Sequence, residues 1–338
     1  FWANLAQMNQ RCGFNFQWMF HGEYGENPLP PDLKALDFLA HFGFDFVRIP
    51  TSYWLWTKDF DYLNPNQDVF KHIDAILAAC RERGIHMSLN SHRGPGYCIN
   101  SNHLEKHNLW KDPEALEGFH HLWRLWAERY KGVPAEVLSF DLLNEPPDEG
   151  QYGMTRADHE RVMRSTIEVI RLVDPTRPIV LNGIGGGHYA IPELADTGTV
   201  HSGRGYLPMT LSHQGATWWT GWQGEPYPQW PGALWLGKTW DADALDELFQ
   251  PWRDVAATGT PVMVGEFGCF NQVPNGMALA WVRDIMSVWK REGWGWAMWG
   301  FEGAFGIIEH GREGAVYEDV FGYQVDRKML DLLLEMRI

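Results

Sequence analysis

The 338-residue sequence is poor in the features that mark several large classes of protein. Cysteine occurs only at Cys12, Cys80, Cys98 and Cys269, with neither a CxxC pair nor the spacing of a zinc site. A chain of this size needs no disulfide scaffold, so four free thiols and one bridge are equally open. No apolar run reaches the roughly 18 residues that a membrane-spanning helix requires.

Basic residues are also few. Lysine and arginine total 28 against 43 acidic residues, which gives a formal net charge of −15 with histidine neutral. An acidic chain is repelled by phosphate backbones and anionic lipid surfaces, so nucleic acid and membranes are poor candidate partners. A neutral ligand is expected instead. No secretory hydrophobic segment is found, but the chain begins at Phe1 rather than Met. The compartment is left open, with a secreted or periplasmic location slightly favoured over a cytoplasmic one.

Aromatic residues, by contrast, are abundant. The chain has 19 Trp, 18 Phe and 11 Tyr. Phenylalanine is readily assigned to a core, whereas a fully buried tryptophan needs a partner for its N–H. Many of the tryptophans lie in Gly- and Pro-rich stretches, and flat rings with a polar edge suit sugars. The composition therefore favours a cleft for carbohydrate.

Eight apolar segments alternate with amphipathic ones along the chain. The expected strands are 13–20, 46–50, 85–90, 137–145, 178–182, 199–206, 261–268 and 293–299. Helices are expected from Asp32, and over 67–83, 112–131, 156–173, 241–258, 276–291 and 327–336. Eight strand–helix units predict a parallel sheet closed into a (β/α)8 TIM barrel of the α/β class. Without a linker or a short repeat, residues 1–338 are expected to form one catalytic domain.

Two of the expected strands end in a carboxylate. Asn144-Glu145-Pro146 closes the fourth strand, since proline cannot donate to a ladder, and Glu266 closes the seventh. Barrel enzymes place catalytic groups at the carboxyl ends of their strands. Glycoside cleavage needs such a pair, one protonated and one ionised, and Asn144 beside Glu145 is placed to bond a sugar 2-hydroxyl. The sequence therefore predicts glycoside hydrolysis with Glu145 and Glu266 as catalytic groups.

These residues, in combination with others at strand ends, resemble glycoside hydrolase family 5, the large cellulase-type family of retaining (β/α)8 enzymes. The resemblance covers Arg48, His92, Asn144, Glu145, Tyr206, Glu266 and Trp299. It implies that Glu145 is the acid/base and Glu266 the nucleophile, with no cofactor and no metal. It further implies that Arg48 and Tyr206 orient Glu266, that His92 and Asn144 hold the substrate, and that Trp299 forms the floor of the sugar site.

One position departs from the family pattern. Two residues before Tyr206 the family usually has histidine, and this chain has Arg204. His201 lies an odd number of residues before Tyr206, so its side chain should face the opposite side of a regular strand. The neighbouring glycines permit a bulge that would bring it to the same face as Tyr206. Arg204 is expected either to supply charge near Glu145 or to bind the sugar.

Further substrate contacts are expected from loops. The long stretch 207–240 holds six tryptophans among glycines and prolines, and at least one of Trp218 and Trp219 is expected to stack on a sugar. Glu23 and Glu302 follow the first and eighth strands and can bond sugar hydroxyls, with a plain surface role equally open.

The leading substrate is a β-1,4-glucan, as a polysaccharide or oligosaccharide bound by a monomer. Mannan, xylan and exo-acting β-glycosidase alternatives stay open, because loops set the subsites. A carbohydrate-binding pseudoenzyme would be favoured had either glutamate been lost. A metal-dependent hydrolase would need convergent ligands, which His92 alone does not supply.

Overall fold

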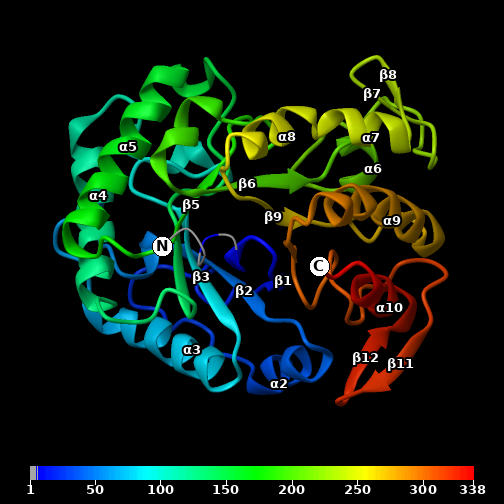
Figure 1. Ribbon diagram of the computed structural model, residues 1–338, viewed down its shortest axis with the longest axis horizontal. Coiled ribbons are helices and arrows are strands. Elements are labelled where there is room, and N and C mark those ends of the chain that lie inside the picture. The colour runs from blue at the N-terminus through cyan, green and yellow to red at the C-terminus, as the bar shows by residue number, and fades with distance from the viewer. Residues whose placement is uncertain (1–4, 6) are drawn as a thin grey trace.

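The computed structural model describes residue 5 and residues 7–338. Eight parallel strands close into a barrel in the order β1-β10-β9-β6-β5-β4-β3-β2 (Figure 1). They are β1 (Cys12–Asn15), β2 (Phe46–Ser52), β3 (His86–Arg93), β4 (Leu138–Asp141), β5 (Ile179–Asn182), β6 (Val200–Gly205), β9 (Val262–Phe267) and β10 (Trp296–Met298). The predicted TIM-barrel fold is confirmed, with each of the eight expected strands present.

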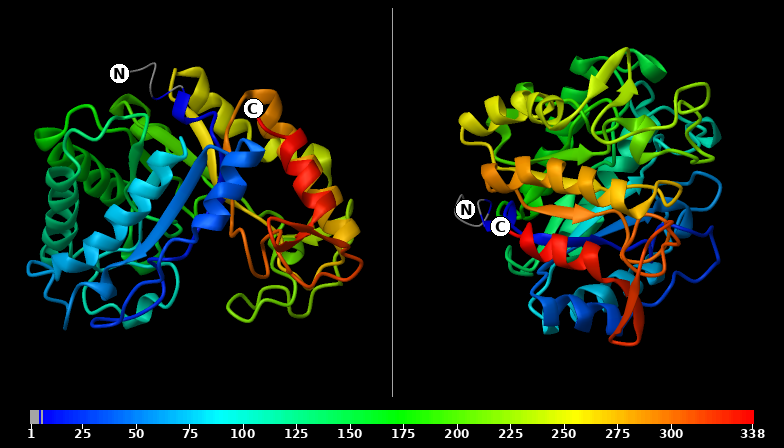
Figure 2. Two further views of the ribbon diagram at one scale, coloured as in Figure 1. Left: turned by 90° about the horizontal axis from the view of Figure 1, so that it is seen from below. Right: turned by 90° about the vertical axis from the view of Figure 1, so that its right-hand side faces the viewer.

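Helices surround the barrel. They are α2 (Leu33–Phe42), α3 (Phe70–Glu82), α4 (Pro113–Arg129), α5 (Arg156–Val173), α6 (Met209–Ser212), α7 (Ala242–Leu248), α8 (Gln250–Ala257), α9 (Asn275–Glu292) and α10 (Arg327–Glu335). Figure 2 shows α9 and α10 side by side on the outside of the barrel. No helix in the described part of the chain is both long and apolar enough to cross a membrane.

Local sequence explains where several helices begin. Thr155 and Asp158 form a reciprocal capping box at the start of α5, with N–O distances of 3.1 and 3.0 Å. The expected helix 241–258 is instead two helices, which corrects the prediction. Pro251 lies in the first turn of α8, and because a proline ring clashes with the carbonyl four residues earlier, the chain restarts there.

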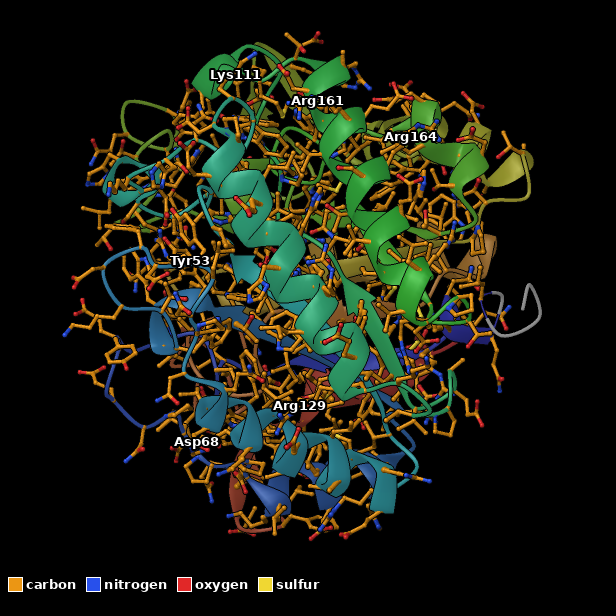
Figure 3. The ribbon with its side chains drawn as sticks, turned by 90° about the vertical axis from the view of Figure 1, so that its left-hand side faces the viewer. Tyr53, Asp68, Lys111, Arg129, Arg161 and Arg164 are labelled. Carbon is orange, nitrogen blue, oxygen red and sulfur yellow. The ribbon has the colours of Figure 1, made fainter. Side chains whose placement is uncertain are left out.

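The outer helices are also joined by ion pairs. Arg129 at the end of α4 bonds Asp74 of α3 at 2.5 Å, and Lys111 bonds Asp158 of α5 at 2.7 Å. Figure 3 shows Arg129 and Lys111 at opposite ends of this helical face. Because both pairs are partly solvated, each contributes no more than about 1 kcal/mol.

Two antiparallel pairs stand outside the barrel. The stretch 207–240 contains β7 (Ala233–Trp235) and β8 (Lys238–Trp240), and a second pair joins β11 (Tyr317–Val320) to β12 (Tyr323–Asp326). Both lie to the right of the barrel in Figure 1. The β11–β12 hairpin is absent from the predicted elements. Its turn has positive φ at Phe321 (57°) and Gly322 (75°), as a two-residue hairpin turn requires.

The core holds more tryptophan than the composition suggested. Eight of the 19 tryptophans are less than 2% exposed: Trp56, Trp110, Trp123, Trp126, Trp252, Trp281, Trp289 and Trp296. A second, smaller cluster that includes Phe46, Val180, Val200 and Met263 fills the inside of the barrel. The excess of tryptophan therefore belongs largely to packing between strands and helices, and it is a weaker sign of a sugar cleft than the sequence indicated.

The four cysteines are all free and buried. Burial raises the pKa of Cys12, Cys80 and Cys98 to about 12 and that of Cys269 to about 11. Of the two alternatives left open by the sequence, the structure has four separate thiols.

Candidate active site

Glu145 follows β4 in a strained conformation. The regular strand ends at Asp141, earlier than expected. Beyond it the Leu142 N–H bonds the Val180 carbonyl at 3.1 Å and the Asn144 N–H bonds the Ser91 carbonyl at 3.0 Å. Glu145 itself has φ of 46°, which is uncommon for a side chain with Cβ and disfavoured before proline. Its N–H donates to Asn182 Oδ1 at 3.2 Å and its carbonyl accepts from the Tyr97 hydroxyl at 2.6 Å. Strain maintained in this way is typical of functional positions.

Glu266 lies within β9 and is only 3% exposed. Its Oε1 accepts a hydrogen bond from Arg48 Nη1 at 2.6 Å, and its Oε2 accepts one from the Tyr206 hydroxyl at 2.9 Å. Arg204 Nη2 lies 3.4 Å from Oε1. The carboxylate is therefore fixed in orientation and surrounded by donors that favour its ionised form.

Arg48 connects Glu266 to the next strands. Besides Glu266, it donates to Asp141 Oδ2 at 2.6 Å, Asn15 Oδ1 at 3.1 Å and Asn144 Oδ1 at 2.8 Å. Both the cation and Asp141 are 1% exposed. A buried charge is tolerated only when it is paired and hydrogen-bonded, and this network satisfies that condition.

Arg204 reaches both glutamates from β6. Its Nε donates to Glu145 Oε1 at 2.8 Å, and its side chain is fully buried. A register shift between β6 and β9 pairs Gly203 with Val264 but Arg204 with Glu266, so Gly265 is an extra residue on β9. This bulge brings Arg204 and Glu266 to the same face of the barrel.

The bulge does not bring His201 into the site. His201 is fully buried and lies near His159 of α5, which is also fully buried. Burial lowers its pKa to about 4, which keeps it neutral. Of the two faces that the sequence left open for His201, the structure has the one toward the helices.

The two glutamates have opposite electrostatic environments. Burial, and then the nearby charge of Glu266, raise the pKa of Glu145 to about 8 against the opposing effect of Arg204. Burial would raise the pKa of Glu266 as well, but Arg204 and Arg48 outweigh it and lower the pKa to about 2. Between these values one carboxyl holds a proton and the other is ionised, which is the arrangement of an acid beside a nucleophile.

His92 and Trp299 lie together beside Asn144. Since Asn144 Oδ1 accepts from two arginines, its amide nitrogen must face His92 Nε2, 3.3 Å away. That nitrogen then accepts, so the proton of the neutral ring is on Nδ1, which has no protein partner. Burial lowers the pKa of His92 to about 3. The His92 ring stacks on Trp299 at 5.5 Å and makes an edge contact with the Phe20 ring at 4.3 Å.

Trp218 is connected to the catalytic pair by aromatic contacts. The ring of Tyr206 lies 6.2 Å from that of Phe305, which in turn lies 6.0 Å from Trp218. Trp218 is 57% exposed, so one side of it faces solvent. Trp219 is half-buried and packs on Gly221, where an added Cβ would lie 2.4 Å from its ring.

Glu23 and Glu302 lie farther out. Both are exposed, and no recorded contact in the described part of the chain joins either one to Glu145 or Glu266. Partial burial and the charge of Asp32 at the start of α2 raise the pKa of Glu302.

Several residues of the site were not singled out from the sequence. Asn15, Asn182 and Ser202 all contact the arginines and are each no more than 2% exposed. Asn15 and Asn182 are the polar last residues of β1 and β5, and Ser202 lies within β6 beside His201. Their polarity in barrel strands was the available signal, because a buried polar group needs a partner.

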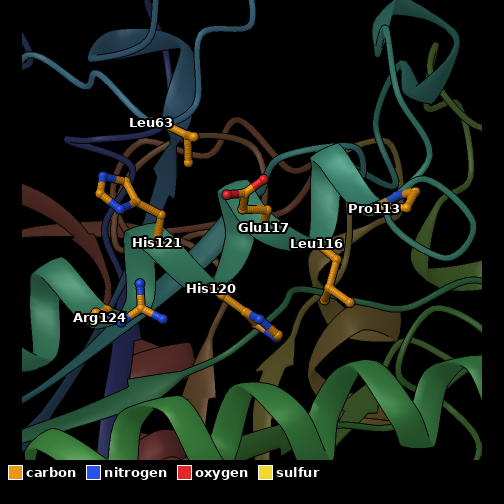
Figure 4. Close-up of a pocket in the computed structure, with 7 residues that line it drawn as sticks. All are labelled: Leu63, Pro113, Leu116, Glu117, His120, His121 and Arg124. Carbon is orange, nitrogen blue, oxygen red and sulfur yellow. The ribbon is translucent and has the colours of Figure 1, made fainter.

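A separate hollow lies on the outer face of α4. It is lined by Leu63, Pro113, Leu116, Glu117, His120, His121 and Arg124 (Figure 4). His120 bonds the Ser165 hydroxyl of α5 at 3.0 Å. No cluster of three or more His, Cys, Asp or Glu side chains suited to a metal ion occurs among residue 5 and residues 7–338.

The chain is similar to proteins of known classification. Residues 6–304 match the family described as Cellulase (glycosyl hydrolase family 5). A crystal structure of a glycoside hydrolase is 54% identical, covers 97% of this chain and 100% of its own, and has a TM-score of 0.96. A mutant form of Thermotoga maritima Cel5A in complex with cellobiose is 23% identical with a TM-score of 0.76 over 98% of each chain, which shows the shared fold.

Two curated relatives are more distant in sequence. Endoglucanase C of Acetivibrio thermocellus is 29% identical over 194 residues, 55% of this chain and 53% of that protein, so the match spans about half the relative's length. Cellodextrinase A of Ruminococcus flavefaciens is 26% identical over 283 residues, 82% of this chain and 80% of that protein.

Proposed function

The chain belongs to glycosyl hydrolase family 5, and from that premise we propose that it hydrolyses β-glycosidic bonds by double displacement, with a β-1,4-glucan as substrate. The observation that carries the proposal is the pair Glu145 and Glu266, joined through one guanidinium and shifted in pKa in opposite directions. The names of the endoglucanase and cellodextrinase relatives support the substrate class.

In the first half-reaction Glu266 attacks the anomeric carbon while Glu145 protonates the departing glycosidic oxygen. Glu266 Oε1 is close to two guanidinium groups, whereas Oε2 has only the hydrogen bond from Tyr206. Oε2 is therefore the oxygen that we assign to the attack. The C–O bond to the leaving group breaks as the ester to Glu266 forms.

In the second half-reaction water replaces Glu266. Glu145, now ionised, takes a proton from water as the new C–O bond forms and the ester breaks. Two inversions give net retention of configuration. Arg48 and Tyr206 keep Glu266 oriented, and Trp299 with His92 and Asn144 provides the surface that holds the reacting sugar.

Trp218 is the residue that we assign to a sugar beyond the bond being cleaved. Two observations support this assignment: its ring is exposed, and it is connected to Tyr206 by ring contacts through the buried Phe305. Trp219 is the weaker candidate because its ring packs on its own loop. Glu23 and Glu302 remain assigned to sugar hydroxyls outside the catalytic pair, with smaller expected effects.

The test is proton NMR of the first-formed anomer during hydrolysis of a cello-oligosaccharide. A β-anomer formed first supports retention, and an α-anomer formed first would contradict the assignment of Glu266 as nucleophile. Product analysis on matched β-glucan, mannan and xylan oligosaccharides then tests the substrate. A higher kcat/KM on mannan or xylan would replace the glucan assignment and leave the reaction unchanged.

A further inference from the structure

Arg204 has no hydrogen-bond donor left for a substrate. Its Nε–H bonds Glu145, and its Nη1 atom faces the Gly203 carbonyl at 3.0 Å and Ser202 Oγ at 3.4 Å. Its Nη2 atom faces Asn182 Oδ1 at 2.6 Å, with Asn144 and Glu266 beside it. The five N–H groups of the guanidinium are therefore all occupied by protein acceptors.

The surrounding backbone is shaped around this side chain. At Gly187, whose φ is +85°, an added Cβ would lie 2.5 Å from Arg204 Cγ. At Gly265 an added Cβ would lie 2.5 Å from Ser202 Oγ and 3.1 Å from Arg204 Nη1. A larger residue at either place would displace the guanidinium, so its position is built into three strands and a loop.

We propose that Arg204 is a positioning residue of the second half-reaction, which holds Glu145 as an ionised base once Glu266 has become esterified to the sugar. This inference rests on the proposed double displacement and names the group that allows Glu145 to change from acid to base.

The positions of the negative charges around Arg204, before and after the first half-reaction, support its role in holding Glu145 ionised. In the free enzyme the cations that contact the two glutamates are Arg48 and Arg204. The anions bonded to these two arginines are Asp141 and Glu266, because Glu145 holds its proton. After the first half-reaction Glu266 is a neutral ester and Glu145 is a carboxylate. The number of anions is unchanged, and the negative charge has moved between the two groups that Arg204 contacts.

Other titratable groups near Arg204 leave this balance unaltered. The neighbours without charge are His92, His188 and Tyr206. Burial lowers the pKa of His92 to about 3 and that of His188 to about 4, and it raises the pKa of Tyr206 well above its usual value. Arg204 also favours one oxygen for the acid proton. Its Nε–H always donates to Glu145 Oε1, and because a carbonyl oxygen accepts a hydrogen bond better than a carboxyl hydroxyl does, the proton of Glu145 is assigned to Oε2.

The experiment compares Arg204→Gln with wild type on a dinitrophenyl cellobioside, whose leaving group needs no acid. Loss of the cation should slow the second half-reaction much more than the first, because Arg48 and Tyr206 still bond Glu266 in the first. We expect a pre-steady-state burst of dinitrophenolate followed by a kcat reduced on the order of tenfold or more. Azide needs no base, so it should restore turnover and give the β-glycosyl azide. The acid limb of kcat should move upward by about one pH unit or more, since a carboxyl without its cation ionises later.

Two further variants separate this role from a structural one. Arg204→Lys keeps the charge and should recover part of the lost kcat. Arg177→Gln removes another fully buried arginine, paired with Asp174 far from the site, and should lower Tm without a burst or a displaced acid limb. If Arg204→Gln does not fold, Arg204→Lys is measured instead, and a burst with azide rescue is again the expected result.

Equal slowing of both phases with an unmoved acid limb would overturn the proposal, because Arg204 would then act only as scaffold for Glu266. A labelling experiment on the wild-type enzyme distinguishes an error in the role of Arg204 from an error in the proposed double displacement. If a 2-fluoro glycoside does not label Glu266 in wild type, double displacement itself is wrong. If it does label Glu266 and Arg204→Gln behaves as scaffold, only the role of Arg204 is wrong.

Discussion

The pH dependence of kcat/KM follows directly from the environments of the two glutamates. On an unactivated cello-oligosaccharide, activity requires Glu266 ionised and Glu145 protonated. Activity should therefore fall as the pH drops toward about 2, and again as it rises through about 8. Raising the pKa of Glu145 from its ordinary 4.5 to about 8 corresponds to roughly 5 kcal/mol in favour of the protonated acid.

Assignment of the upper limb requires a second substrate. With a dinitrophenyl glycoside the first half-reaction needs no acid, so kcat/KM should stay level above pH 8, whereas on the oligosaccharide it falls about tenfold per pH unit. Glu145→Gln is the matched control, with the upper limb absent on both substrates. An upper limb of the same position on both substrates in wild type would refute the reasoning, because the titrating group could not be the acid.

Three further predictions concern single residues. Glu266→Ala should abolish formation of the glycosyl-enzyme. Glu145→Ala should retain activity on activated glycosides, and azide should increase its turnover. The reverse pattern in stopped-flow and azide assays would exchange the roles of the two glutamates. Trp218→Ala should raise KM on a long oligosaccharide several-fold with little change in kcat, because it loses about 0.5–1.5 kcal/mol of stacking on the sugar. Trp219→Ala should mainly lower Tm. An unchanged KM in both variants would rule out a stacking site at this pair. Glu145→Gln should raise Tm at pH 9 and leave it nearly unchanged at pH 4. The folded-state pKa of Glu145 is raised, so its stability contribution is complete below its unfolded pKa and lost as the pH rises through about 8; equal Tm changes at both pH values would argue against that raised pKa.

Helix boundaries set by capping residues close in the sequence could be predicted, whereas the length of a strand could not. The helix 156–173 was predicted to the residue because Thr155 and Asp158 cap it from neighbouring positions in the sequence. The first strand was predicted too long. The regular strand ends at Asn15, although the Phe16 N–H still bonds the Arg48 carbonyl at 3.0 Å and Met19 forms an isolated bridge with Thr51. The apolar pattern continues because Phe16 and Trp18 stack on each other at 4.4 Å and are buried.

Some residues of the site could be predicted from the sequence, whereas the contacts of others depend on the folded barrel. Glu145, Glu266 and Arg48 could be found because each interrupts or ends an apolar strand. The contact of Arg204 with both glutamates depends on the bulge at Gly265, and a one-residue shift in register leaves no mark in the hydrophobic pattern of strands buried on both faces. Asn182 and Asn15 likewise acquire their partners only when the barrel closes, since they bond residues 22 and 33 positions away.

The four buried thiols make the chain suited to site-specific labelling. Thiol reagents attack the thiolate, and at neutral pH groups with a pKa of about 11 to 12 inside the core provide very little of it. Thr239→Cys would introduce an exposed sulfur on β8 with little change in side-chain size. A fluorophore attached there would give a signal from a single site, with the native cysteines left in place. Fluorescence of that label during titration with oligosaccharide would then report whether the surroundings of the β7–β8 pair change when substrate binds.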